Sequence, residues 1–242
     1  MPSKAAVLLS TLLPAVAALA QAPAPQPDHR FAYNAAAVSD YRYRGISQSR
    51  LRPALQGGAD YTHRSGAYLG AWASTIRWIE DAGGGAELEL DLYGGYRFTA
   101  GPVGLDLGVL TYTYPDHGLA VSPNTQEAYA GASWGPATLK YSHAFSNLFG
   151  FADSRNSYYV DLSANFDLGQ GWSLVPHVGY QKVKNNDPFS YTDWSLAVNK
   201  EFGNGLAASA AWVDTDSNGQ YLAPSGKHLA RGGLMLGVKY SF

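Results

Sequence analysis

The chain has no cysteine among its 242 residues, and charged residues make up only 15% of the sequence. The absence of cysteine excludes a disulfide scaffold and disfavours a zinc site. The 17 Lys and Arg residues against 19 Asp and Glu residues give a net charge of −2, which does not fit a basic nucleic-acid-binding protein. Disorder is excluded too, because disordered chains are rich in charge and poor in aromatic residues, whereas aromatic residues make up 13% here.

Downstream of its first 20 residues the chain also lacks long hydrophobic runs, and its mean hydropathy is slightly negative. A helical membrane protein would be far more hydrophobic. The sequence is instead rich in Gly, with 27 residues, and in Tyr, with 17. Low charge without high hydrophobicity is unusual for a soluble protein, and the order of residues along the chain explains the combination.

Residues 1–20 have the features of a secretory signal peptide. Lys4 provides a basic start, residues 5–20 are mainly apolar, and residues 18–20 (Ala-Leu-Ala) form a small-x-small cleavage box. We therefore expect cleavage after Ala20 and export of the mature chain. Residues 21–29 are predicted to be a proline-rich periplasmic linker.

From residue 30 onward apolar and polar residues alternate with period two, which indicates β-strands. In residues 87–98 the polar face contains Glu87, Glu89, Asp91, Tyr93, Gly95 and Arg97. The opposite face of the same segment contains Leu88, Leu90, Leu92, Gly94, Tyr96 and Phe98. About twelve segments of about ten residues follow this pattern, the length of a tilted strand that crosses a bilayer.

The connections between these segments alternate in length. Short connections such as residues 64–66 and 203–205 contain turn residues, whereas connections such as 115–125 and 214–228 are long. Lipid cannot hydrogen-bond a backbone, so a membrane-spanning sheet must close on itself. We predict an all-β, antiparallel transmembrane barrel of about 12 strands over residues 30–242, with its termini and short turns in the periplasm. Six tryptophans are expected to anchor it as aromatic girdles, namely Trp72, Trp78, Trp134, Trp172, Trp194 and Trp212.

The last predicted strand places Val238, Tyr240 and Phe242 in phase on its apolar face. An aromatic C-terminal strand of this kind is typical of outer-membrane barrels and serves as the signal that the barrel-assembly machinery recognises. A soluble β-sandwich or lectin would also alternate, but it does not require this ending. We therefore expect a bacterial outer-membrane protein.

Several segments resemble the TorF family of porins. The most specific is residues 40–49 (DYRYRGISQS), and others are residues 53–61 (PALQGGADY), 68–74 (YLGAWAS), 89–96 (ELDLYGGY) and 191–194 (YTDW). The resemblance covers essentially the whole mature chain. It implies a proteobacterial outer-membrane barrel that acts as a channel, and it implies no catalytic residues.

In such a barrel the polar face of each strand lines the lumen, and the first strand is expected to direct Asp40, Arg42 and Arg44 inward. The remaining predicted lining residues are Asp60, Glu87, Glu89, Asp91, Arg97, Asp106, Glu127, Lys140, Asp161, His177, Asp193 and Lys239. Carboxylates outnumber Arg and Lys by nine to five in this set. Charges that line a pore select ions by sign, so we expect a mild cation preference. The alternative is that these charges pair across a narrow lumen and hold the barrel shut or rigid.

Other motifs are weaker. Residues 214–219 (DTDSNG) match the start of an EF-hand calcium loop, but Ser225 stands where the bidentate glutamate belongs, and strands flank it. An exposed turn rich in Asp, Asn and Gly is the simpler interpretation. Residues 131–135 match G-x-S-x-G, but Pro136 follows where a nucleophile elbow needs a helix. The six histidines have no metal-ligand spacing, and no cofactor, metal or catalytic site is expected.

The leading functional prediction is an outer-membrane porin, not an enzyme, for passive diffusion of ions or small polar solutes. Its expected partners are the lipid bilayer, the barrel-assembly machinery and those solutes, with no nucleic acid; the oligomeric state is open. One alternative is a non-conducting scaffold or adhesin that binds through long loops such as residues 214–228. Another is a barrel hydrolase with His143, or His117 beside Asp116, at its rim.

Overall fold

The structure is a computed structural model that describes residues 27–217 and 219–242. The predicted signal peptide and most of the predicted linker lie outside the described residues. Among the described residues, none belongs to a helix long and apolar enough to cross a membrane.

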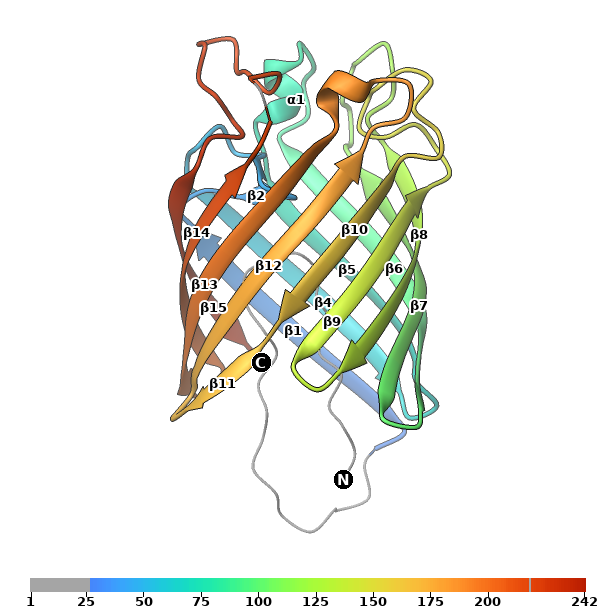
Figure 1. Cartoon of the computed structure of the whole chain (residues 1–242), viewed down its shortest axis with the longest axis vertical. Helices are drawn as coiled ribbons and strands as arrows, with labels where there is room; N and C mark the ends of the chain where they lie inside the picture. Colours follow the sequence, from blue (N-terminus) through green and yellow to red (C-terminus); the bar gives the residue numbers. More distant parts are fainter. Residues whose placement is uncertain (1–26, 218) are drawn as a thin grey trace.

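The strands form one closed antiparallel sheet in which β1 (His29–Val38) pairs with both β4 and β15 (Figure 1). The other strands of this sheet are β4 (Ala54–His63), β5 (Ala67–Thr75), β6 (Leu88–Ala100), β7 (Val103–Thr113), β8 (Thr125–Trp134), β9 (Ala137–Ala144), β10 (Tyr158–Ala164), β11 (Phe166–Gly169), β12 (Trp172–Lys182), β13 (Tyr191–Gly203), β14 (Leu206–Thr215) and β15 (Gly233–Ser241). β10 and β11 pair with β12 on one continuous register across Asn165, so they are two parts of a single strand. Counted in this way, the 13-stranded sheet has 12 spanning strands. The predicted fold class is therefore confirmed.

The two ends of the barrel differ in the length of their connections, as predicted (Figure 1). Turns 64–66, 101–102, 135–136, 170–171 and 204–205 lie at one end, which we call the turn end. Connections 39–53, 76–87, 114–124, 145–157, 183–190 and 216–232 lie at the other, which we call the loop end. The loop-end connections contain the short helices α1 (Trp78–Asp81) and η1 (Asp187–Phe189) and the hairpin strands β2 (Arg42–Tyr43) and β3 (Ile46–Ser47).

Side-chain exposure follows the predicted alternation. On β6, Leu92 is 51% exposed on the outer face, whereas Glu89 and Asp91 are each only 2% exposed on the inner face. The last strand places Val238, Tyr240 and Phe242 on the exposed outer face. The barrel is therefore apolar outside and polar inside.

The tryptophan prediction holds only in part. The four that lie on the exposed outer surface are Trp134 and Trp172 beside turns at the turn end, and Trp194 and Trp212 toward the loop end. Trp72 instead points inward on β5, because its register sets it beside the inward Asp91 of β6. Trp78 lies on α1, with its ring 5.0 Å from that of Tyr114.

The barrel is wide enough to need filling. Twelve strands about 4.8 Å apart and tilted by about 40° enclose a backbone cylinder with a radius of about 12 Å. At the loop end, connection 39–53 folds into this space (Figure 1). We call this segment the lumen loop.

Candidate functional site

The lumen loop corrects the prediction for the first strand. β1 ends at Val38, so Asp40, Arg42 and Arg44 lie on the lumen loop and not on the strand. Arg42 and Tyr43 pair with Ser47 and Ile46 in a small hairpin. All three predicted residues are buried, yet they line the lumen from the loop and not from the wall.

The tip of this hairpin requires an unusual backbone. Arg44 and Gly45 both have positive φ, at 47° and 80°, as in a type I′ turn. A Cβ atom on Gly45 would lie 2.6 Å from Cγ2 of Thr215 and 2.8 Å from Cβ of Asp193. Only glycine fits here, which lets the tip of the hairpin approach β13 and β14 closely.

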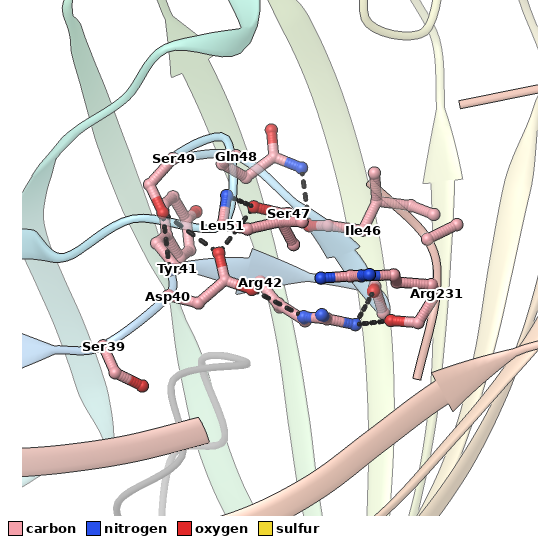
Figure 2. Close-up of polar contacts among 12 residues, drawn as sticks. Ser39, Asp40, Tyr41, Arg42, Ile46, Ser47, Gln48, Ser49, Leu51 and Arg231 are labelled. Carbon is pink, nitrogen blue, oxygen red and sulfur yellow. Dashed lines mark hydrogen bonds and ion pairs between the residues drawn. The ribbon is translucent and has the colours of Figure 1, made fainter. Parts of the chain in front are cut away.

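Asp40 organises the base of the lumen loop, as Figure 2 shows. Arg42 Nε donates to Asp40 Oδ2 at 2.8 Å. The other carboxylate oxygen accepts hydrogen bonds from the hydroxyls of Ser47, at 2.5 Å, and Ser49, at 3.1 Å. Arg42 Nη1 also donates to the carbonyl of Arg231, at 2.6 Å, on the β14–β15 connection. A buried charge needs such partners, so this network fixes the loop inside the barrel.

The Arg44 side chain spans the lumen to the far wall. Its Nη2 donates to Glu127 Oε1 and Oε2 of β8 at 3.0 Å and 2.7 Å, and its Nη1 donates to Gln181 Oε1 of β12 at 2.7 Å. The guanidinium carbon lies 4.4 Å from the centre of the Tyr159 ring of β10 and 4.8 Å from that of Tyr43. Three wall strands are thus tied to one loop residue.

Apolar and backbone contacts hold the rest of the lumen loop. The rings of Tyr41 and Trp72 meet edge-on at 5.4 Å, and Ile46 packs in a cluster with Tyr191 and Leu229. Ser47 N donates to the carbonyl of Leu229 at 2.9 Å. The loop is therefore attached both to the barrel wall and to another loop-end connection.

Two inward carboxylates of β6 face this loop without a basic partner among the described residues. Glu89 Oε1 accepts a hydrogen bond from the Tyr41 hydroxyl at 2.9 Å. Burial, together with the nearby Glu89 charge, raises the pKa of Tyr41 well above its usual value, so the hydroxyl stays protonated as the donor. Asp91 is 2% exposed, and its buried Oδ1 has no hydrogen-bond partner.

Nearer the turn end, charged groups pair with one another and with tyrosines. Arg97 Nε lies 3.2 Å from Asp106 Oδ2, and its guanidinium lies 3.8 Å from the centre of the Tyr68 ring. The Tyr68 hydroxyl donates to Asp106 Oδ1 at 2.6 Å, while the Lys140 ammonium lies 4.1 Å from the centre of the Tyr129 ring. The Arg97 and Asp106 side chains are more exposed, at 20% and 26%, than the paired side chains of Arg44 and Glu127, at 4% and 1%.

The opposite wall contains a histidine between two carboxylates. His177 Nε2 lies 2.9 Å from Asp161 Oδ2, and its Nδ1 lies 3.6 Å from Asp193 Oδ1. The Tyr159 hydroxyl donates to Asp193 Oδ2 at 2.9 Å. The same Tyr159 ring contacts the Arg44 guanidinium, so Tyr159 connects the histidine and its two carboxylates to the surroundings of Arg44.

Glu87 is the predicted lining residue that the structure places elsewhere. It precedes β6 on the α1–β6 connection, is exposed, and accepts a hydrogen bond from Arg77 at 2.7 Å. Conversely, Tyr112, Tyr159 and Gln181 are lumen residues outside the predicted set. All three share the inward phase of their strands, so period-two alternation indicates their position, whereas the predicted lining contains only Asp, Glu, Arg, Lys and His residues.

The described residues of the weaker motifs form local hydrogen bonds, and Asn218 of the 214–219 motif lies outside the described residues. Asp214 and Asp216 accept hydrogen bonds from the backbone N–H groups of Thr215 and Thr192. Ser133 shares a hydrogen bond with Thr138 at 2.9 Å. Within residues 27–217 and 219–242, no group of three or more His, Asp or Glu is arranged to hold a metal ion.

Solved porin structures have a similar fold. The chain superposes on a KdgM porin with a TM-score of 0.59 at 9% identity, covering 87% of this chain and 99% of that one. A NanC porin gives 0.58 at 11% identity, with coverage of 87% and 99%. The outer-membrane protein Omp33 of Acinetobacter baumannii gives 0.50 at 6% identity, with coverage of 88% and 97%. At these identities the similarity shows the fold alone.

No curated protein sequence matches the chain, and its resemblance to the TorF family stays a prediction. One family model does match, over residues 21–242, and its description is "Bacterial protein of unknown function (Gcw_chp)". This match covers the whole barrel, and the chain therefore belongs to the bacterial family Gcw_chp.

Proposed function

We propose that the chain is an outer-membrane channel for ions or small polar solutes, with a preference for cations. The observation that carries this proposal is the closed barrel with exposed apolar side chains outside and charged side chains inside. Only closed barrels and helices satisfy every backbone group in lipid. The fold shared with the KdgM and NanC porins supports the same role.

The location follows from the same features. The outer face contains leucines and aromatic residues along its strands, and Trp134 and Trp172 flank the turn end. We propose that the barrel-assembly machinery inserts the chain through its C-terminal strand and that residues 1–20 direct export. The turn end then faces the periplasm and the loop end faces outward.

Unbalanced carboxylates support the cation preference. Asp40 is paired with Arg42, and Glu127 with Arg44, so these four side chains contribute little net charge. Glu89 and Asp91 are two further inward carboxylates beside the lumen loop, and neither has a basic partner among the described residues. Where such carboxylates are ionised, they attract cations into a pore and repel anions.

A polyanionic solute fits this lumen poorly. One solved KdgM porin contains disordered oligogalacturonate, a polymer of acidic sugars. The carboxylates beside the lumen loop would repel such a chain. We therefore propose cations and small neutral polar solutes as the permeating class.

A non-conducting scaffold is the second candidate, and a specific observation favours it. The lumen loop is largely buried, with Arg42 ion-paired to Asp40 within the loop and Arg44 ion-paired across the lumen to Glu127 of β8. Such pairing is expected if these charges hold the barrel rigid. A scaffold of this kind would act through its loop-end connections.

Solute flux distinguishes the two candidates. Liposomes that contain the purified, folded protein should swell in isosmotic solutions of small sugars, and planar bilayers should show discrete current steps. Protein that is folded, as judged by its heat-modifiable migration on gels, yet gives neither swelling nor current steps would exclude the channel and leave the scaffold.

A further inference from the structure

The wall around Arg44 has the composition of a binding site for a planar cation. Glu127 accepts two hydrogen bonds from the guanidinium, Gln181 accepts another, and the Tyr159 ring lies against its face. A carboxylate, an amide oxygen and an aromatic face are the groups that recognise guanidinium best. All three wall residues come from spanning strands, whereas the lumen loop supplies the cation.

The position of Arg44 is costly for the backbone. Its φ of 47° lies in the left-handed region, which asparagine and glycine adopt far more readily than arginine. Asparagine followed by Gly45 would form the same turn without this strain. Strain of this kind persists where the surrounding contacts over-determine the conformation, and here those contacts are made by the guanidinium.

We propose that Glu127, Gln181 and Tyr159 form a binding site for guanidinium-type cations, which Arg44 fills when the lumen loop closes the passage. A solute with a guanidinium group then opens the passage by displacing Arg44. Binding at the wall stands independently of the proposed function, whereas the opening step rests on it.

Replacement of the Arg44 guanidinium by a solute guanidinium at the wall site changes the contact energy little. A free guanidinium can make the same hydrogen bonds and the same ring contact as Arg44, so tethering is the main advantage of Arg44. A short tether gives an effective concentration of about millimolar. Displacement in the native chain therefore needs solute at or above that concentration, and removal of the Arg44 side chain lowers the requirement.

The binding test uses ethylguanidinium chloride titrated calorimetrically into the folded full-length barrel in detergent micelles. Arg44→Ala should bind it at least about tenfold more tightly than the native chain or the Arg44→Ala/Glu127→Gln double variant, because hydrogen bonds to charged groups are the strongest in the site. Ethylammonium, which lacks the planar guanidinium group and its fixed set of N–H donors, should bind more weakly. Equal affinities in all three proteins would overturn the proposal.

Two further variants control this comparison. Arg64→Ala removes an exposed arginine at the turn end, which pairs with Asp28, and should behave as the native chain. Arg44→Lys keeps the positive charge but lacks the planar guanidinium group, so the lysine competes less well for the wall site. This variant should therefore bind ethylguanidinium more tightly than the native chain does. The lysine variant preserves the test if Arg44→Ala does not fold, and native-like affinity in it would count against the site.

Currents in planar bilayers separate the opening step from the proposed function. Arg44→Ala should conduct several-fold more than the native chain, and ethylguanidinium at millimolar concentration or above should raise the current of the native chain. Tight binding with no current from any variant would refute the channel and leave the binding site. If the channels conduct, but Arg44→Ala has the same affinity for ethylguanidinium and the same current as the native chain, the binding site is refuted and the channel stands.

Discussion

Leu92→Arg tests the assignment of the two barrel faces. Leu92 is 51% exposed near the middle of β6, whereas its neighbour Asp91 is 2% exposed and points inward. An arginine on the lipid face at mid-bilayer costs about 2–4 kcal/mol, which lowers the folded-to-unfolded ratio by about 30- to 800-fold. Urea titration of folding into lipid vesicles, followed by heat-modifiable gel migration, measures this loss directly.

The matched control lies on the inner face of the same strand. Glu89→Gln keeps an oxygen that can accept the hydrogen bond from Tyr41 and removes a carboxyl group that has no basic partner among the described residues. Its free energy of unfolding should change by no more than about 1.5 kcal/mol. Equal losses in Leu92→Arg and Glu89→Gln would mean that the face assignment is wrong.

Three further predictions concern the loops and the C-terminus. Gly45→Ala should detach the hairpin tip, since its Cβ would collide with β13 and β14, and protease cleavage within residues 39–53 should accelerate; unchanged cleavage would contradict the packing. The hydrogen bond from Lys182 lowers the pKa of Asp187, so this contact should be complete above the ordinary aspartate pKa of about 3.9 and be lost as the pH falls through a lower midpoint. A carboxyl NMR titration with a midpoint at or above the ordinary value would disprove this. Deletion of Phe242 should reduce the outer-membrane fraction of the chain in cells, and an unchanged fraction would argue against the C-terminal signal.

Local pattern was enough to predict most of the fold. Period-two alternation fixes which side chains face outward because a strand turns each successive side chain to the opposite face. Glu89 and Leu92 therefore lie on the predicted faces. The alternating loop lengths follow from the same topology, since an up-and-down barrel has one set of connections at each end.

The lumen loop could not be predicted in this way. Asp40, Arg42 and Arg44 continue the period-two pattern beyond Val38, so the sequence gives no sign that the strand has ended. The partners that hold Arg44, namely Glu127 and Gln181, lie 83 and 137 residues away along the chain. Contacts at such separations depend on the closure of the barrel, which no local pattern contains.

Misplacement of Trp72 and Glu87 has related causes. Tryptophan is predicted in girdles because the membrane interface suits it. A backbone cylinder about 12 Å in radius also needs large side chains inside, and the register of β5 points Trp72 inward. Glu87 keeps the phase of β6 but precedes its first residue. Strand boundaries, rather than phase, limited the prediction of the lining.

The central claim is that a cation-preferring passage runs through the charged lumen. The most direct test is the reversal potential of the purified protein in a planar bilayer across a KCl gradient. We predict current steps with potassium more permeant than chloride, and a selectivity that falls in the Glu89→Gln/Asp91→Asn variant. Anion selectivity, or silence from protein verified as folded in the membrane, would contradict it.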